Sequence, residues 1–313
     1  MSAEVESLCD QLVLVTGAGG FIGSAVVRRL VGLGARVRAW LAPTASPAVI
    51  GPPPGVEIAF GELADLVMLD RQLAGVQCVY HLAGPPSVAA SFASPAEFLR
   101  VHAVGTAVVL ERCIAVGVPR LVYVSSAEIY GPASGAVRED HPAAPRSPYG
   151  IAKLAAEQCV AVCAEAAGLR ATIVRPFSVY GRGAPASSLV ASIVAAIARG
   201  GSPVLADLRP VRDYCEVDEV ADGIVRAGCR DDPRIRAFNL ATGRGLAVIE
   251  VARAILAATG RSDLTIRERT VARPRAALTL SLIGDPTRAR EELGFRPELT
   301  FEAGVHRMLQ GER

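Results

Sequence analysis

The stretch LVLVTGAGGFIG, at positions 12–23, decides the fold of this protein. Its first five residues form a short apolar run typical of a buried strand, and Gly17, Gly20 and Gly23 then follow at GxxGxxG spacing. The next residues, SAVVRRLVGLG, have helical periodicity and end at Gly34. Glycine permits a tight turn and lets a pyrophosphate approach the backbone N–H groups at the positive end of a helix. The stretch therefore predicts a strand, a turn and a helix that bind a dinucleotide, with a purely structural turn as the alternative.

Strand-like and helical patterns alternate over the first part of the chain. The alternation predicts an α/β fold with a Rossmann-type, doubly wound parallel sheet. We expect a dinucleotide-binding domain at 1–176 and a smaller, mostly helical substrate lobe at 177–313, with some segments of the lobe returning to the core sheet. The expected strands are RVRAW, VEIAF, CVYHLAG, RLVYVSS, RATIVRP and AFNLA, and the expected helices lie near 95–116, 147–168, 188–199, 218–229, 246–259 and 300–311.

Composition excludes several classes of function. The 313 residues carry a formal net charge of +2, and so weak a field gives no reason to expect nucleic acid or an anionic membrane as a partner. The N-terminus has no signal-peptide layout, and the longest uncharged, mostly apolar stretch, at 184–198, is too short to cross a bilayer. The seven cysteines have neither paired nor metal-type spacing, so we expect reduced, mostly buried thiols and no metal site. We therefore expect a cytoplasmic protein.

The residue that usually binds the adenosine ribose is missing. In NAD-binding proteins of this kind an acid about 20 residues beyond the glycines binds the ribose 2′-OH. Residues 24–56 contain neither Asp nor Glu, and Leu41 stands where the acid should be. Such a pocket does not repel a 2′-phosphate, and Arg38, Thr44 and Ser46 could hold one. NADP(H) is therefore the favoured cofactor, while NAD(H) stays possible if backbone contacts are sufficient.

Lys153 is the only lysine of the chain, beside 32 arginines. A bias against lysine spares a site that needs a compact ammonium on a flexible stem, because a planar guanidinium cannot replace it. Ser147 and Pro148 favour a helix start, which places Tyr149 and Lys153 at i and i+4 on one helix face. A cation at that distance stabilises a phenolate and brings the pKa of a tyrosine toward neutral pH. The pair is therefore a candidate proton carrier.

Six motifs occur in the order found in one enzyme family: TGAGGFIG, HLAG, VSSAEIYG, SPYGIAK, RPFSVYG and RDYCEVDEVADG. On these residues, and over nearly its whole length, the chain resembles the extended short-chain dehydrogenase/reductases, in particular the nucleotide-sugar epimerase, dehydratase and reductase branch. The resemblance implies an NAD(P)-dependent enzyme with a small-molecule nucleotide-sugar substrate. It also implies a homodimer that pairs the helices expected at 95–116 and 147–168.

The resemblance assigns roles to the residues at matching positions. Tyr149 would be the catalytic acid/base, Lys153 its partner, and Ser126 the hydroxyl that bonds the reacting sugar oxygen. Arg212 would clamp the substrate diphosphate, because a guanidinium fork suits paired phosphate oxygens, and Arg273 is a second candidate for this role. The residues expected to contact the cofactor are Gly17, Gly20, Phe21, Ile22, Gly23, Arg38, Glu62, Leu63, Leu82, Ala83, Gly84, Tyr149, Lys153 and Phe177.

Several positions depart from the family pattern. Family dehydratases carry an Asp–Glu pair after the catalytic hydroxyl, whereas this chain has Ala127–Glu128, so we do not expect 4,6-dehydration, which needs two groups for two roles. Glu128 is either a catalytic group, as in decarboxylases and some reductases of the branch, or an acceptor that positions the substrate. Ser178 replaces the usual Asn at a substrate contact. His102 also stands at an Asn position and is expected to be structural, as is His81 in a buried strand.

Hydride transfer at sugar C4 is common to the reactions that remain. A reductase would use NADPH and a proton from Tyr149 on a 4-keto carbon, a 4-epimerase would keep NAD bound and return the hydride to the other face, and a UDP-glucuronate decarboxylase would oxidise C4 and lose carbon dioxide. The missing ribose acid, and the resemblance of the stretch at 189–214 to such enzymes, favour an NDP-4-keto-6-deoxyhexose reductase. A catalytically silent NAD(P)-binding scaffold is the non-enzymatic alternative, against which the retained Ser126, Tyr149 and Lys153 argue.

Overall fold

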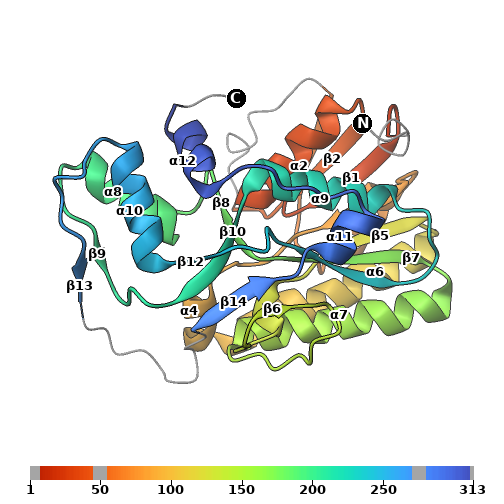
Figure 1. Ribbon diagram of the computed structural model, residues 1–313. Coiled ribbons are helices and arrows are strands. Elements are labelled where there is room, and N and C mark those ends of the chain that lie inside the picture. The colour runs from red at the N-terminus through yellow and green to blue at the C-terminus, as the bar shows by residue number, and fades with distance from the viewer. Residues whose placement is uncertain (1–7, 45–54, 270–279, 311–313) are drawn as a thin grey trace.

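A seven-stranded parallel sheet forms the centre of the molecule (Figure 1). The computed structural model describes residues 8–44, 55–269 and 280–310. The strands lie in the order β11–β7–β5–β4–β1–β2–β3, and every neighbouring pair is parallel. Their bounds are β1 Leu12–Thr16, β2 Arg36–Leu41, β3 Val56–Phe60, β4 Cys78–His81, β5 Arg120–Val124, β7 Arg170–Pro176 and β11 Arg236–Leu240.

Helices cover both faces of this sheet (Figure 1). Side chains alternate along each strand, so that Val13 and Val15 of β1 face one layer of helices while Leu14 faces the other. Because both faces are buried, the strands are continuous apolar runs, and the predicted doubly wound fold is confirmed. The first layer holds α2 (Phe21–Gly32) and α9 (Val217–Cys229), and the second holds α3 (Leu66–Leu73), α6 (Gly105–Val116) and α7 (Pro148–Ala167).

Two long helical stretches of the second layer end at glycine. The segment at 95–116 is α5 (Pro95–Leu99), a five-residue π-helical segment η2 (Arg100–Val104) and α6, and it stops at Gly117 with φ of 77°. Helix α7 begins as the sequence predicts, because the Ser147 hydroxyl accepts a hydrogen bond from the backbone N–H of Gly150 at 3.0 Å. It ends at Gly168, whose φ is 69°.

The part of the chain after β7 builds a smaller lobe beside the carboxyl edge of the sheet (Figure 1). Three of its elements, α9, β11 and α11 (Thr287–Glu292), lie with the large sheet, so the division of the chain at residue 176 stays a prediction. The helices of the lobe are α8 (Leu189–Ala198), α10 (Val248–Ala258) and α12 (Phe301–Gln310). Short strands form the rest. One sheet holds β8 (Ser178–Tyr180), β10 (Val211–Glu216), β12 (Gly245–Ala247) and β14 (Ser281–Gly284), and it is joined by β6 (Ala136–Val137) from before α7; β9 (Val204–Leu205) pairs with β13 (Arg267–Glu268).

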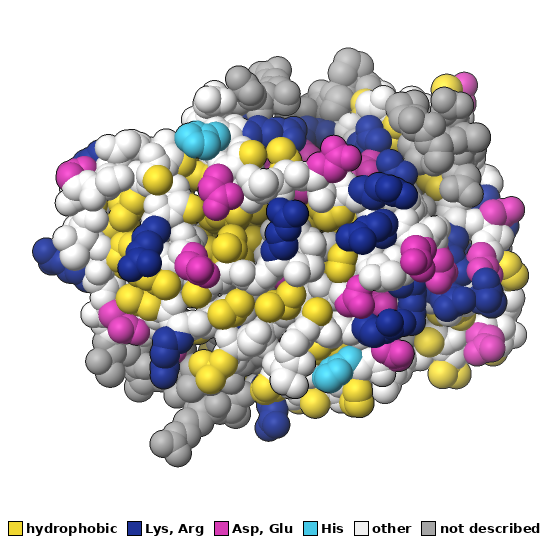
Figure 2. All heavy atoms as spheres, viewed as in Figure 1, with side chains coloured by type: hydrophobic (Ala, Val, Ile, Leu, Met, Phe, Trp, Pro, Cys, Tyr) yellow, Lys and Arg dark blue, Asp and Glu magenta, His cyan; other side chains and the backbone are white. Residues whose placement is uncertain are grey.

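Several features bear on possible partners. Among the described residues, none of the helices has both the length and the apolarity that crossing a membrane requires. The same residues contain no cluster of three or more His, Cys, Asp or Glu side chains suited to a metal. All seven cysteines are free, and four of them are buried. Basic and acidic side chains are interspersed over the face drawn in Figure 2, so this face presents no field of a single sign.

Candidate active site

The glycine turn between β1 and α2 has no room for side chains. Gly17 has φ of 70°, and a Cβ on it would lie 2.8 Å from the backbone nitrogen of Ala83 at the end of β4. A Cβ on Gly23 would lie 2.1 Å from the carbonyl oxygen of Gly17. Because glycine has no Cβ, the turn can lie directly against its own helix and the neighbouring strand. Backbone atoms alone therefore line this part of the site.

The start of α2 suits a bound phosphate. Gly20 is the residue before the helix, and no side chain caps the first turn, in which Phe21 and Ile22 are half-buried. Backbone N–H groups at a helix start have no partner within the helix, and the helix dipole favours negative charge there. The turn therefore fits the pyrophosphate of a dinucleotide, as the spacing of the glycines predicts.

Arg38 does not lie at the edge where a 2′-phosphate would bind. Its Nε donates to Glu57 at 2.8 Å, and its Nη1 donates to the carbonyl oxygens of Gln72 and Ala74 at 2.9 Å each. These carbonyls lie at the end of α3, near the start of β4, whereas the glycine turn follows the end of β1. Because β1 and β4 are parallel, the two places lie at opposite edges of the sheet. The expectation that Arg38 holds the phosphate is corrected accordingly.

The remaining residues near the expected ribose give little preference between the cofactors. Leu41 is fully buried, Thr44 is exposed, and Ser46 lies outside the described residues. Glu62 is exposed and Leu63 half-buried just beyond β3, where they stay predictions for the adenine. Without Arg38 as a ligand for the 2′-phosphate, the preference for NADP(H) over NAD(H) rests only on the missing acid near the ribose.

Tyr149 and Lys153 lie one turn apart on the buried face of α7. The Lys153 ammonium donates a hydrogen bond to the carbonyl oxygen of Val124, at the end of β5, at 2.8 Å. Its Nζ lies 5.2 Å from the ring centre of Tyr123 and 6.0 Å from that of Tyr149. Both aromatic faces are favourable neighbours for a cation. Helix α7 and strand β5 thus meet at the only lysine.

Burial changes the pKa values of both groups. Burial lowers the pKa of Lys153 to about 7, against the charge of Glu157, which raises it. Burial raises the pKa of Tyr149 to about 12, although a hydrogen bond with Ser126 lowers it, and the charge of Glu128 raises it further. Burial therefore moves the two pKa values apart, that of Lys153 down and that of Tyr149 up, and the expectation that Lys153 brings the Tyr149 pKa toward neutral pH is corrected for this geometry. Strongly shifted pKa values of two groups one helical turn apart are typical of a functional site.

Ser126 and Glu128 lie directly beyond β5, in and before the short helix η3 (Ala127–Ile129). The Ser126 hydroxyl accepts a hydrogen bond from the backbone N–H of Glu128 at 3.2 Å, and it lies near enough to the Tyr149 hydroxyl to lower the pKa of that tyrosine. Burial raises the pKa of Glu128, while the charge of Arg212, in β10, lowers it. Four of the predicted residues, two from η3 and its N-cap and two from α7, are therefore brought together, and the charge of Arg212 in β10 acts on one of them.

The other predicted residues lie around this group. Leu82, Ala83 and Gly84 follow β4, and the Thr16 hydroxyl accepts a hydrogen bond from the backbone N–H of Ala83 at 3.3 Å. The Phe177 ring is buried against Tyr130, with the two ring centres 6.3 Å apart. Two further predictions concern the substrate: Ser178 is half-buried in β8, and Arg273 lies outside the described residues.

Two histidines differ in their relation to the site. His81 is satisfied within the core, since its Nδ1 and Nε2 lie 2.6 Å and 3.0 Å from the hydroxyls of Thr16 and Thr106. His102, which the sequence indicates only as a structural residue, lies edge-on to Tyr149, with ring centres 5.3 Å apart. Its Nε2 donates to the carbonyl oxygen of Pro85 at 3.0 Å, since that oxygen can only accept. Burial lowers the pKa of His102 to about 3, so the ring is neutral. No signal in the sequence places this ring against Tyr149.

We predict that Gly23→Ala disrupts the nucleotide turn. The new Cβ would overlap the Gly17 carbonyl, so the turn must shift, at a cost of about 1–3 kcal/mol in the free energy of unfolding and at least about tenfold in dinucleotide affinity. Urea denaturation and a cofactor titration measure both. Gly32→Ala, at the end of the same helix with nothing within 4 Å of its Cβ, is the control: it should leave the dinucleotide affinity unchanged and should not lower the free energy of unfolding. Equal behaviour of the two variants would contradict the assignment.

Lys153 should titrate near neutral pH. Because it is the only lysine, protein grown on lysine labelled at the Cε carbon gives one side-chain resonance to follow against pH. We expect a midpoint near 7 in the cofactor-free protein, because burial disfavours the ammonium. The urea-unfolded protein is the control, with an expected midpoint of about 10.4. Equal midpoints in the two states would show that the lysine is solvated.

Comparisons with known proteins agree with this geometry. The chain is 31% identical over 316 aligned residues to a UDP-glucose 4-epimerase of Azospirillum brasilense, and the match covers 91% of this chain and 87% of that protein. A solved UDP-glucose 4-epimerase of Thermotoga maritima, with UDP-glucose, superposes with a TM-score of 0.86 at 29% identity, covering 96% of this chain and 98% of that one.

A second solved structure is a dTDP-glucose 4,6-dehydratase of Streptomyces venezuelae with NAD bound. It superposes with a TM-score of 0.88 at 28% identity and covers 96% of each chain. The family model described as "NAD dependent epimerase/dehydratase family" matches residues 13–241, which include the glycine turn, Ser126, Tyr149 and Lys153. The chain therefore belongs to the NAD dependent epimerase/dehydratase family and is an enzyme of the extended short-chain dehydrogenase/reductase type.

Proposed function

We propose that this protein is a nucleotide-sugar 4-epimerase that keeps NAD bound. The observation that carries the proposal is the constellation of Ser126, Tyr149 and Lys153, in which the buried ammonium lies one helical turn from the buried tyrosine and the half-buried Ser126 lies near enough to lower the pKa of Tyr149. The UDP-glucose 4-epimerases similar to this chain over nearly its whole length support the sugar and the carbon, and the NAD bound by the Streptomyces venezuelae dehydratase supports the cofactor.

Each residue of the constellation has a defined task in such a reaction. The Ser126 hydroxyl holds the C4 oxygen of the sugar beside the Tyr149 hydroxyl. Tyr149 takes the proton from that oxygen when C4 is oxidised and returns it when C4 is reduced. The Lys153 ammonium stabilises the phenolate form of Tyr149, because a cation favours the charged form of a neighbouring acid. When bound at the glycine turn, NAD supplies the carbon that accepts the hydride and gives it back.

The substrate groups are assigned by charge. Arg212 lies close enough to Glu128 to lower the pKa of that carboxyl, so a diphosphate bound by Arg212 would lie next to the catalytic residues. Glu128 is half-buried and stands alone, since Ala127 replaces the acid that would precede it. A single carboxylate suits an acceptor for a sugar hydroxyl, and it argues against 4,6-dehydration.

An NDP-4-keto-6-deoxyhexose reductase that uses NADP(H) is the second candidate. The observation that favours it is the end of β2, where the buried Leu41 leaves no carboxylate to repel a 2′-phosphate. Arg38 no longer supports it, because its guanidinium is used by Glu57 and by the end of α3. We place the epimerase first for this reason.

We expect the purified protein to release stoichiometric NAD when it is denatured. We also expect Tyr149→Phe to release the same NAD but to lose epimerase turnover about a thousandfold, since the proton carrier is gone. Tyr80→Phe is the control, because this buried tyrosine contacts the Val225 carbonyl on the far side of the sheet and should retain turnover. A protein that is empty when purified and binds NADPH far more tightly than NADH would support the reductase and overturn the epimerase.

Exposed apolar side chains follow one side of α7 and of the helix beside it. Ile151 and Val162 of α7 are 50% and 67% exposed, and Val104 is 58% exposed. Residues 151, 155, 159 and 162 recur at helical spacing, and so form one stripe. We propose that a second copy of the chain covers this stripe, as the resemblance predicts for the helices at 95–116 and 147–168.

We predict that Val162→Glu converts the protein to a monomer. In a symmetric dimer that covers the stripe, each chain would bury the new carboxylate close to that of the second chain. Loss of hydration and repulsion between the two carboxylates would both oppose association. Sedimentation velocity measures the result. Val204→Glu, at a valine that is 51% exposed in β9 of the smaller lobe, is the matched control. A wild-type protein that is monomeric at all concentrations would contradict the proposal.

A further inference from the structure

A buried ion pair lies directly behind the catalytic lysine. Glu157 is one turn beyond Lys153 on α7, so Tyr149, Lys153 and Glu157 follow one another on the same face. Arg175 of β7 binds the Glu157 carboxylate with two groups: its Nε donates to Oε2 at 3.2 Å and its Nη2 donates to Oε1. Both side chains are buried. The pair touches none of the residues assigned to substrate or cofactor, so the proposed reaction leaves it without a role.

The same arginine also reaches the segment that carries Ser126 and Glu128. Its Nη1 donates to the hydroxyl oxygen of Tyr130 at 2.7 Å, and its guanidinium carbon lies 5.1 Å from the centre of the Tyr130 ring. Tyr130 is the residue that ends η3. Arg175 therefore connects the two elements that hold the proposed catalytic hydroxyls, η3 on one side and α7 on the other.

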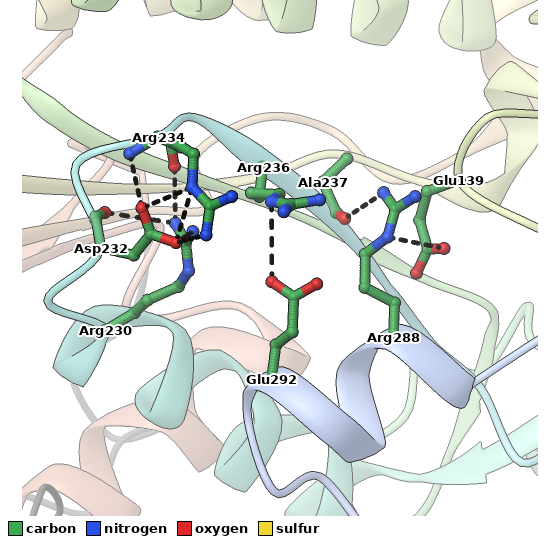
Figure 3. A network of polar contacts seen from close by, with 8 residues as sticks. All are labelled: Glu139, Arg230, Asp232, Arg234, Arg236, Ala237, Arg288 and Glu292. Carbon is green, nitrogen blue, oxygen red and sulfur yellow. Dashed lines mark hydrogen bonds and ion pairs between the residues drawn. The ribbon is translucent and has the colours of Figure 1, made fainter.

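Further hydrogen bonds anchor Tyr130 and connect it to the surface. The Tyr130 hydroxyl donates to Asn239 Oδ1 at 2.6 Å, and the Asn239 backbone N–H donates to the Glu139 carboxylate at 2.8 Å. Arg288 of α11 lies 3.5 Å from that carboxylate and also donates to the Ala237 carbonyl at 3.2 Å (Figure 3). The polar chain therefore runs without a break from α11 to Glu157.

Among the charged groups around Lys153, Glu157 is the anion that raises the pKa of the lysine. Both neighbouring histidines are neutral, since burial, with help from the Lys153 charge, lowers their pKa values to about 3. Glu157 raises the pKa of Lys153, while Arg175 shares the Glu157 charge. The titratable and charged groups around Lys153 are Tyr149 and Glu157 of α7, Tyr123 of β5, His81 of β4, His102 of η2, Glu128 of η3 and Arg175 of β7.

We propose that Arg175 and Glu157 are positioning residues that fix the Ser126 segment against the catalytic helix and hold a partly neutralised negative charge behind Lys153. The inference rests on the proposed function, in which Tyr149 and Lys153 move the proton. The proposal makes two predictions that can be tested separately. The Glu157 charge must influence the ionisation of Lys153, and the Tyr130 hydroxyl must influence catalysis without changing any charge.

The first prediction is tested by Glu157→Gln with the single-lysine titration. Removal of the Glu157 charge should lower the titration midpoint of Lys153 by about one pH unit. The alkaline limb of the plot of kcat against pH should shift to lower pH by a similar amount. Glu165→Gln is the matched control, because it removes an exposed carboxylate from the same helix and should leave the midpoint unchanged. An unmoved midpoint in folded Glu157→Gln would overturn this part of the proposal.

The second prediction is tested by Tyr130→Phe, which keeps every charge and most of the packing. We expect kcat to fall about tenfold, with an unchanged Lys153 midpoint and little change in KM, because the hydroxyls are misplaced rather than removed. Wild-type kcat in this variant would overturn the positioning role. If Glu157→Gln fails to fold, this variant alone decides the proposal.

The two measurements also separate this inference from the proposed function. The lysine titration needs no turnover, so it reports on Glu157 even if the reaction is not an epimerisation. Turnover that survives Tyr149→Phe would instead remove the proposed function and leave the titration result standing.

Discussion

The hydrogen bond from the Lys153 ammonium to the Val124 carbonyl joins α7 to the end of β5 in the large sheet. An ammonium buried in this position loses most of its hydration, and such a loss is tolerated only if nearby dipoles and charges replace the water. The Val124 carbonyl, the face of Tyr123 and the charge of Glu157 supply that replacement. The position of α7, and with it that of Tyr149, depends on this set of contacts.

The parallel sheet brings the rest of the site to the same place. Strands β1, β4 and β5 all end at one edge, so the glycine turn, the segment after His81 and the segment after Val124 meet there although they are far apart in sequence. Close backbone approach is part of this arrangement. The His102 ring occupies the space that a Cβ on Gly84 would need, with its Cε1 2.1 Å from that point.

The substrate side depends on the smaller lobe. Asp213 is fully buried, and its carboxylate accepts hydrogen bonds from the backbone and hydroxyl of Thr242 and from the backbone N–H groups of Gly243 and Gly284. These bonds replace the water that the carboxylate loses on burial. They fix β10, and therefore Arg212, next to Glu128. The lobe thus brings the guanidinium that we propose binds phosphate to a site whose hydroxyls come from α7 and from the segment after β5.

The sequence by itself predicted the strands of the large sheet, its main helices and the spacing of the pair that we propose carries the proton, whereas it predicted none of the short strands of the smaller lobe. Apolar runs bounded by glycine are local signals, so the strands at 12–16, 56–60 and 170–176 have the predicted bounds, and Ser147 and Pro148 start α7 where expected. The spacing of Tyr149 and Lys153 is also local, because four residues make one helical turn. The chain's family followed from motifs of the same kind, and it is confirmed.

Only the tertiary structure decided what each charged side chain contacts. Arg38 has the right position in the sequence for a phosphate ligand, yet Glu57 and the end of α3 use its guanidinium. Arg175 looked like any of 32 arginines, and its place between Glu157 and Tyr130 depends on β7 lying beside β5 beneath α7. Arginine is long and flexible, so its partner is chosen by whichever acceptors the fold brings within reach, and sequence spacing does not contain that information.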